Sequence, residues 1–267
     1  SLSGLEVKAT GGTAWLAFRP KEPQREIAIR STGGARMSID DKTLPLPRVT
    51  LFPEQEGGVT AFWTGETGLS KRWGEFGIGV ARFDAQGQLL VQDSAQAGEL
   101  PTVVTTPDGS RVLINNHSYT LGGEVSAWWQ AKDGSVRTET IATNVKSVQP
   151  TGGWASGSRL VAYWNNESAR DRGEFKLEMA YSDGDGKWPR AALDWDVKEY
   201  PNVVRMAGSD GRNLLMAVLV TVQPEEGGRK EEIRLFHSHD GGASWNKLAE
   251  LRGEAFDYAR QSGFAVK

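Results

Sequence analysis

A pattern of paired strands and glycine-containing turns repeats along this chain, and it restricts the fold more than any other feature. Short apolar or alternating segments, each preceded by such a turn, lie at 13–18, 59–63, 111–115, 159–164 and 214–219. A second set, each followed by a tight turn, lies at 26–30, 77–82, 124–129, 175–180 and 232–236. This alternation is typical of β-strands. Because no long helical stretch separates the strands, we expect an all-β fold.

The spacing of the repeats predicts the architecture. The five units recur about every 50 residues, within the range of roughly 40 to 50 residues that four-stranded propeller blades occupy. At 267 residues, the chain has the size of one domain with a single core. We therefore predict a single β-propeller domain over residues 1–267, built from four-stranded antiparallel blades. Five blades is the expected count, and six is the alternative if the chain ends combine into another blade.

Composition argues against several classes of protein. The 31 basic and 34 acidic residues are spread along the chain, so no basic face favours nucleic acid. Cysteine is absent, which removes disulfides, thiolate metal sites and cysteine nucleophiles. Three histidines are few for a metal centre, and we expect neither a metal nor a cofactor. No apolar run approaches the ~20 residues of a transmembrane segment.

The turn SHDGGASW, at 238–245, has the composition of a structural turn. A short Asp side chain accepts hydrogen bonds from turn amides, Gly permits a positive φ, and Trp places a large apolar surface beneath the turn. We expect His239 to be exposed to solvent. The sequence therefore predicts that this turn serves as scaffold.

The same turn resembles the Asp-box of the sialidase-like, or BNR-repeat, β-propellers. The matching residues are Ser238, Asp240, Gly242 and Trp245, and a shortened version contains Ser182, Asp183 and Trp188. The resemblance implies that the turn joins the third and fourth strands of a blade, on the face away from the substrate site. It also implies a structural role for all seven residues.

Polar and aromatic residues gather at the opposite ends of the predicted strands, in and beside the loops between the second and third strand of each unit. Aromatic faces stack on sugar rings, amides bond hydroxyl groups and Arg binds carboxylates through two hydrogen bonds. The alternative interpretation is that the loop charges are merely solvated and the Trp side chains pack between blades. The candidate ligand-binding residues are Arg19, Trp63, Arg72, Asn116, His117, Trp164, Asn165, Arg170 and Arg172, and the candidate catalytic residues are Glu167 and Asp171.

Three functions follow from these residues. The first is a binding module that recognises a glycan or a protein partner through its loop face. The second is a glycoside hydrolase that uses Glu167 or Asp171 as acid and arginines for an anionic substrate. For a sialidase, the resemblance implies an early Arg-Ile-Pro motif, and the chain has only Phe18-Arg19-Pro20. The third is a structural or assembly protein of the bacterial envelope. The oligomeric state stays open, and we expect a periplasmic or secreted protein whose signal peptide is not in this chain.

Overall fold

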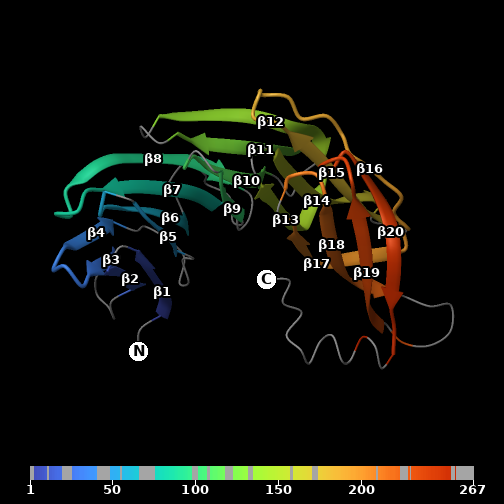
Figure 1. Ribbon diagram of the computed structural model, residues 1–267, viewed down its shortest axis with the longest axis horizontal. Helices are drawn as coiled ribbons and strands as arrows, with labels where there is room; N and C mark the ends of the chain where they lie inside the picture. The colour runs from blue at the N-terminus through green and yellow to red at the C-terminus, as the bar shows by residue number, and fades with distance from the viewer. Residues whose placement is uncertain are drawn as a thin grey trace. The chain divides into compact units, whose positions relative to one another are not determined.

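The computed structural model divides into two compact units, Ser1–Leu100 and Pro101–Lys267, and each is described by itself (Figure 1). The prediction of a single propeller domain, of five or six blades, stays a prediction. The described residues are 3–10, 12–19, 26–40, 49–54, 56–65, 76–97, 102–106, 109–117, 123–131, 135–156, 159–169, 174–208, 210–222, 228, 230–253 and 256.

The first unit contains two four-stranded antiparallel sheets, each with its strands in sequence order. The first sheet consists of β1 (Ser3–Thr10), β2 (Thr13–Arg19), β3 (Glu26–Ser31) and β4 (Arg36–Asp40). The second consists of β5 (Val49–Pro53), β6 (Val59–Gly65), β7 (Phe76–Phe83) and β8 (Leu89–Ala97). Buried side chains of both sheets, including Trp15, Ile29, Leu51 and Trp63, form one apolar cluster.

The second unit contains three sheets. The third sheet of the chain consists of β9 (Thr102–Thr105), β10 (Arg111–His117), β11 (Gly123–Gln130) and β12 (Val136–Val145). The fourth consists of β13 (Ser147–Ser156), β14 (Arg159–Ala169) and β15 (Glu174–Ser182). The fifth consists of β17 (Glu199–Ala207), β18 (Leu214–Val222), β19 (Lys230–Ser238) and β20 (Ser244–Leu251), with β16 (Ala192–Leu193) added in parallel beside β20.

The fourth sheet differs from the predicted four-strand pattern at its outer edge. The segment after β15 returns along it, and the backbone N–H of Ala191 donates to the carbonyl of Met179 at 2.9 Å. Pro189 accepts from the N–H of Tyr181 at 3.1 Å but has no N–H of its own, so a regular ladder cannot run through it. The segment then forms β16 in the next sheet, and an irregular edge takes the place of a fourth strand.

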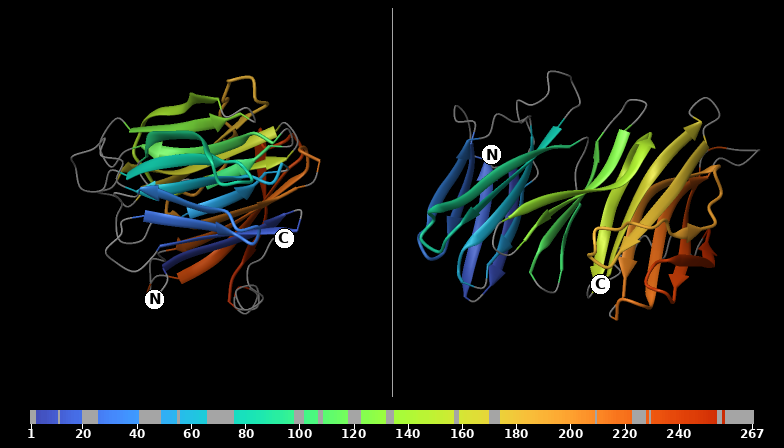
Figure 2. Two further views of the ribbon diagram at one scale, coloured as in Figure 1. Left: turned by 90° about the vertical axis from the view of Figure 1, so that its left-hand side faces the viewer. Right: turned by 90° about the horizontal axis from the view of Figure 1, so that it is seen from above.

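Successive residues of β14 are buried on both faces of the fourth sheet. Leu160 and Trp164 belong to a core cluster that includes residues of the third sheet, whereas Val161 and Tyr163 belong to one that includes residues of the fifth. This period of two is the signature of a strand between two packed layers. The three sheets of this unit accordingly stack face to face (Figure 2).

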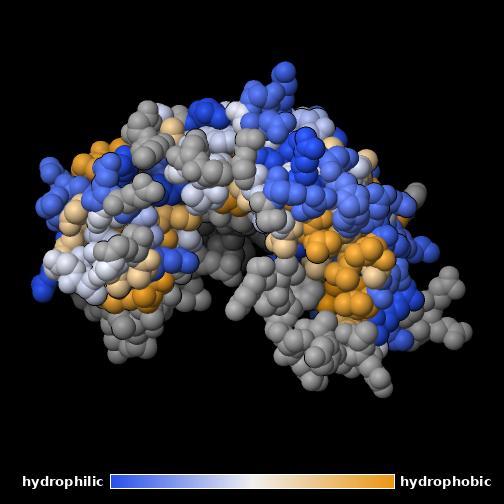
Figure 3. Space-filling model, in the orientation of Figure 1, coloured by the Kyte–Doolittle hydropathy of each residue, from blue (hydrophilic) through white to orange (hydrophobic). Residues whose placement is uncertain are grey.

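The other face of the fifth sheet carries a smaller apolar cluster. Hydrophobic surface gathers over β18 and β19 in Figure 3. Leu215 is 51% exposed. The buried members are Ala217, Ile233 and Phe256, with Leu219, Leu235 and Leu251 packed against them.

The all-β class and the antiparallel sheets built mainly of four strands, predicted from the repeats, are confirmed. The two predicted sets of strands correspond to β2 and β3, β6 and β7, β10 and β11, β14 and β15, and β18 and β19, each an antiparallel pair. Within the part of the chain that the structure describes, no helix has the length and apolar character to cross a bilayer.

Candidate functional site

Each sheet has two ends that differ in the connections they carry. Because its strands are antiparallel and follow in sequence order, the turns after its first and third strands lie at one end, here called the turn end. The connection between its second and third strands lies at the other, here called the loop end. Turn ends close on their own backbones: the N–H of Asp84 bonds the carbonyl of Gln88 at 3.0 Å, and that of Thr106 bonds Ser110 at 2.9 Å.

The turn between β19 and β20 is held by its own side chains. The Ser238 hydroxyl accepts from the N–H of Gly242 at 2.8 Å and donates to Asp240 Oδ1 at 2.8 Å. Asp240 in turn accepts from the N–H of Ser244 at 2.9 Å and from its hydroxyl at 2.6 Å. Partial burial raises the pKa of Asp240, but the bonds from Ser244 and Ser238 outweigh it and lower the pKa overall. The buried Trp245 ring donates to the carbonyl of Gly242 at 3.1 Å.

The shorter turn after β15 also binds its neighbours. The Ser182 hydroxyl accepts from the backbone two residues on at 3.1 Å, and Asp183 pairs with Arg159 at 3.4 Å. Trp188 donates from Nε1 to Glu139 Oε2 at 2.9 Å while its ring packs against the core. These contacts are ones that a scaffold uses.

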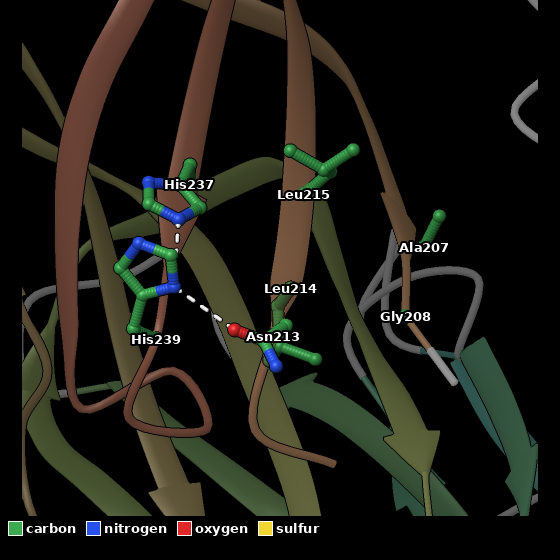
Figure 4. A pocket seen from close by; sticks show the side chains of 7 residues that line it. All are labelled: Ala207, Gly208, Asn213, Leu214, Leu215, His237 and His239. Atoms are coloured by element: carbon green, nitrogen blue, oxygen red, sulfur yellow. Dashed lines mark hydrogen bonds between the residues drawn. The ribbon is translucent and has the colours of Figure 1, made fainter. Parts of the chain in front are cut away.

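A pocket with a volume of about 500 Å³ lies at the turn end of the fifth sheet (Figure 4). One wall is apolar and contains the exposed side of Leu215, and polar groups gather on the other. The lining residues are Ala207, Gly208, Asn213, Leu214, Leu215, His237 and His239.

Three side chains of this pocket converge on one nitrogen atom. His239 Nδ1 lies 2.9 Å from Asn213 Oδ1 and 3.0 Å from His237 Nε2, and the two imidazole centroids are 3.6 Å apart. Asp210 orients the amide, because its Oδ2 accepts from Asn213 Nδ2 at 2.7 Å. Bonds from the backbone and side chain of Asn213 and from the backbone of Arg212 lower the pKa of Asp210 to about 2.

The loop end of the fifth sheet holds a buried ionic cluster. Arg234, on β19 and 1% exposed, donates from Nε to Glu199 Oε1 at 2.8 Å and from Nη1 to Glu232 Oε2 at 2.9 Å. Glu250 lies 3.7 Å from Arg234 Nε, and Arg252 pairs with Glu232 at 2.9 Å. Burial lowers the pKa of Arg234, but the bonds to Glu199 and Glu232 outweigh it and raise the pKa overall.

Sequence reasoning missed this cluster. The charged run at 223–232 has the composition of a solvated loop, but its last residues, 230–232, belong to β19. The two-residue period of a strand was the available signal. Arg234, Phe236 and Ser238 are every second residue of β19, so Arg234 points to the same buried face as the other two.

Two of the predicted sugar platforms differ from expectation, because both rings are buried. Trp63 is 7% exposed, and its ring packs so closely on Gly79 that a Cβ atom added to this glycine would lie 2.1 Å from the ring. Trp164 is 0% exposed; its Nε1 donates to Glu178 at 3.1 Å and the Arg190 guanidinium lies 4.4 Å from the ring centroid. Both rings therefore belong to the packed interior, as the alternative interpretation of these Trp side chains expected.

The other predicted loop residues fall into three groups. Asn165 is fully buried beside Trp164. Arg19, Asn116, His117 and Glu167 have described backbones at or near the ends of β2, β10 and β14, each at the loop end of its own sheet. The remaining candidates, Arg72, Arg170, Asp171 and Arg172, lie outside the described residues.

No protein-family model matches the chain, and no curated protein matches it either. Among solved structures, a GH43 β-1,3-galactosidase is similar at 11% identity and a TM-score of 0.43 over 88% of this chain, which spans 56% of that protein. An α-L-arabinanase of Penicillium chrysogenum is similar at 12% identity and a TM-score of 0.48, over 78% of this chain and 68% of that one. The N11 neuraminidase-like protein of a flat-faced bat influenza virus is similar at 8% identity and 0.48, over 90% and 72%. With TM-scores below 0.5, these likenesses carry no weight for the activity of this chain.

Proposed function

We propose that the protein is a glycan-binding module that recognises its ligand through the loop ends of its sheets. The contrast between the two ends of each sheet carries this proposal. At the described turn ends, the polar groups form hydrogen bonds with the backbone and side chains of the same turn, as in the Ser238–Ser244 turn. The loop ends of the first, third and fourth sheets instead carry residues of the types that a sugar recognises, Arg19, Asn116, His117 and Glu167, and loops are where function is usually added to a rigid scaffold.

The positions of four candidates support this proposal. Arg19, His117 and Glu167 each stand at or near the last residues of a second strand, and Asn116 precedes His117. A regular strand holds the backbone of a binding residue more rigidly than a loop does, which reduces the entropy lost on binding. Amide, guanidinium, imidazole and carboxyl groups can form hydrogen bonds with the hydroxyl groups of a sugar. The buried Trp63 and Trp164 help to hold their strands in the packed sheets.

The charge of the fifth sheet favours a neutral glycan at its loop end. Arg234 is buried and already donates to Glu199 and Glu232, so its guanidinium is not available to a substrate carboxylate. Three glutamates surround Arg234 and Arg252 there, and Lys247 pairs with one of them, Glu250, so the three cations of this cluster are all paired. An anionic sugar would therefore find no unpaired cation in the cluster, whereas hydroxyl groups bond carboxylates readily.

A glycoside hydrolase is the second candidate, because Glu167 lies at the loop end of β14 only four residues before Asp171. A carboxylic acid and a second carboxylate are the minimum for glycoside hydrolysis. A structural or assembly role with a protein partner is the third candidate function. For all three candidate functions, we propose a periplasmic or secreted location.

A glycan array run beside a fluorogenic glycosidase panel tests the proposal. Wild type should bind neutral glycans without turnover, and Arg170→Gln with Arg172→Gln should weaken binding. Asp185→Asn, an exposed change at a turn end, is the matched control and should bind as wild type. Turnover that disappears in Glu167→Gln with Asp171→Asn would replace the binding proposal by the hydrolase. No signal in either assay would overturn both and favour a protein partner.

A further inference from the structure

We propose that Phe175, Tyr200, Asn202 and Thr221 form a subsite for one neutral sugar ring at the loop ends of the fourth and fifth sheets. The inference rests on the glycan-binding function proposed above and assigns part of that function to these four residues. None of them was a candidate at the level of sequence, where the expected platforms were two Trp rings that the structure buries. The aromatic surface for a sugar must therefore come from other residues.

The aromatic part of the subsite is a pair of perpendicular rings. Phe175 is the second residue of β15 and Tyr200 the second residue of β17, so both stand at a loop end. Their ring centroids lie 4.6 Å apart at an interplanar angle of 86°. Both residues are half-buried, so part of each remains in contact with solvent. Two such rings form a corner in which the apolar C–H face of a sugar can lie on one ring, beside the edge of the other.

A backbone hydrogen bond joins the segments that carry the two rings. The N–H of Phe175 donates to the carbonyl of Val197 at 2.9 Å, which links the start of β15 to the residues that lead into β17. β17 lies at one edge of the fifth sheet, so Tyr200 has a strand neighbour in that sheet on one side only. Rings held in this way lose little conformational entropy when a ligand binds.

The polar part of the subsite lies next to Tyr200. Thr221 is directly opposite Tyr200 in the register of β17 and β18, and its Oγ1 accepts a hydrogen bond from Asn202 Nδ2 at 2.8 Å. This bond leaves the Thr221 hydroxyl hydrogen as a donor and Asn202 Oδ1 as an acceptor, and neither has another partner among the described residues. Turning the amide over exchanges these roles but again leaves a donor and an acceptor side by side. A sugar hydroxyl both donates and accepts, so it can form two hydrogen bonds with this pair.

A β-bulge places Asn202 in this position. The register of β17 and β18 shifts between Pro201 and Val203, so Asn202 is an extra residue of β17. Such an extra residue bends the strand and re-aims a side chain, and bulges are common next to functional sites. Here the side chain is directed to Thr221. The bulge, the available donor and acceptor, and the perpendicular rings are separate observations at one end of the sheet.

The subsite adjoins a candidate residue that the sequence identified. Glu167 is directly opposite Phe175 in the register of β14 and β15. Directly opposite residues of an antiparallel pair lie on the same face of a sheet, with their Cβ atoms about 5 Å apart. A glycan that stacks on the aromatic pair therefore lies beside Glu167, the residue to which the hydrolase alternative assigns the acid.

Calorimetric titration of the full chain with cellotetraose, xylotetraose and mannotetraose tests the proposal. Wild type should bind at least one of these neutral oligosaccharides. Phe175→Ala and Tyr200→Ala should each lower the affinity about tenfold, because a ring at the centre of a contact is worth more than 1 kcal/mol. Tyr200→Phe keeps the ring and should bind nearly as wild type. Tyr181→Ala, which removes a half-buried ring at the turn end of β15, is the matched control and should leave the affinity unchanged.

Conservative variants test the polar pair without opening a cavity. Asn202→Leu and Thr221→Val keep the shape of each side chain, and each should lower the affinity about fivefold, since a sugar hydroxyl loses one partner. Thermal unfolding establishes that every variant folds. Saturation-transfer NMR with irradiation of aromatic protons should label the C–H protons of a bound sugar in wild type and Tyr200→Phe, and much less in Tyr200→Ala.

The outcomes separate the subsite from the general function. If wild type binds and folded Phe175→Ala and Tyr200→Ala bind equally well, the subsite is overturned while the glycan-binding function stands. If wild type binds none of the three oligosaccharides, the subsite for a neutral sugar is overturned, and the glycan array then decides whether the general function survives.

Discussion

The guanidinium of Arg234 donates from both Nε and Nη2 to a single carboxylate oxygen, Oε1 of Glu199, and joins β19 to the first residue of β17. Both groups are buried. A buried charge of this kind is strongly destabilising when it loses its partner.

Glu199→Gln should therefore lower the free energy of unfolding by about 2–4 kcal/mol, because the remaining partners of Arg234 replace only part of the lost charge. Urea unfolding measures the effect. Glu231→Gln, an exposed change on β19, the strand of Arg234, is the control and should cost much less. Equal values for the two variants would show that Arg234 does not need Glu199.

The stabilising effect of ionised Glu250 should be lost in acid. A hydrogen bond from Lys247 lowers its pKa, burial raises it, and attraction to Arg234 and Arg252 lowers it further. Because the pKa in the folded state is below its ordinary value of 4.5, its stabilisation is present above that value and is lost as pH falls through the folded pKa. Glu250→Gln should flatten the fall in urea midpoint from pH 6 to pH 3; an unchanged slope would contradict this.

Asp240→Ala should destabilise the turn between β19 and β20 by roughly 1–3 kcal/mol, since the Ser244 N–H and hydroxyl lose their acceptor. Thermal unfolding monitored by circular dichroism is the measurement. Asp185→Ala, in the exposed turn after β15, provides the comparison. A melting temperature equal to that of the wild type would show that Asp240 does not stabilise the turn.

Trp164→Ala should cost about 3–5 kcal/mol, because it opens a cavity in the cluster between the third and fourth sheets. Trp164→Phe keeps most of the ring volume and should cost less. Trp164 was predicted as a ligand-binding residue, with packing between blades as the alternative. Full stability of Trp164→Ala in urea would restore the ligand-binding interpretation.

The strands were predictable because each one satisfies a local rule. Segments such as 159–164 alternate with a period of two and are bounded by glycine turns, and local chemistry alone specifies both features. The side-chain bonds of the Ser238–Ser244 turn also arise within a few residues of sequence.

Contacts that depend on register could not be predicted in the same way. Arg234 and Glu199 meet only because β18 pairs with both β17 and β19 in a particular register. Trp164 is the last residue of the strand segment predicted from sequence, 159–164, but β14 continues to Ala169, and the burial of the Trp164 ring follows from packing against the neighbouring sheet. The convergence of Asn213 with two histidines likewise joins two separate turns.

The β16 segment has a consequence for how this protein avoids self-association. An outer strand such as β20 presents unpaired backbone groups to any passing chain. The parallel bridge of Ala192 and Leu193 with Ser244 and Trp245 occupies the start of that edge. The same segment pairs through Ala191 with the edge of the fourth sheet, so one short stretch covers part of the edges of two sheets.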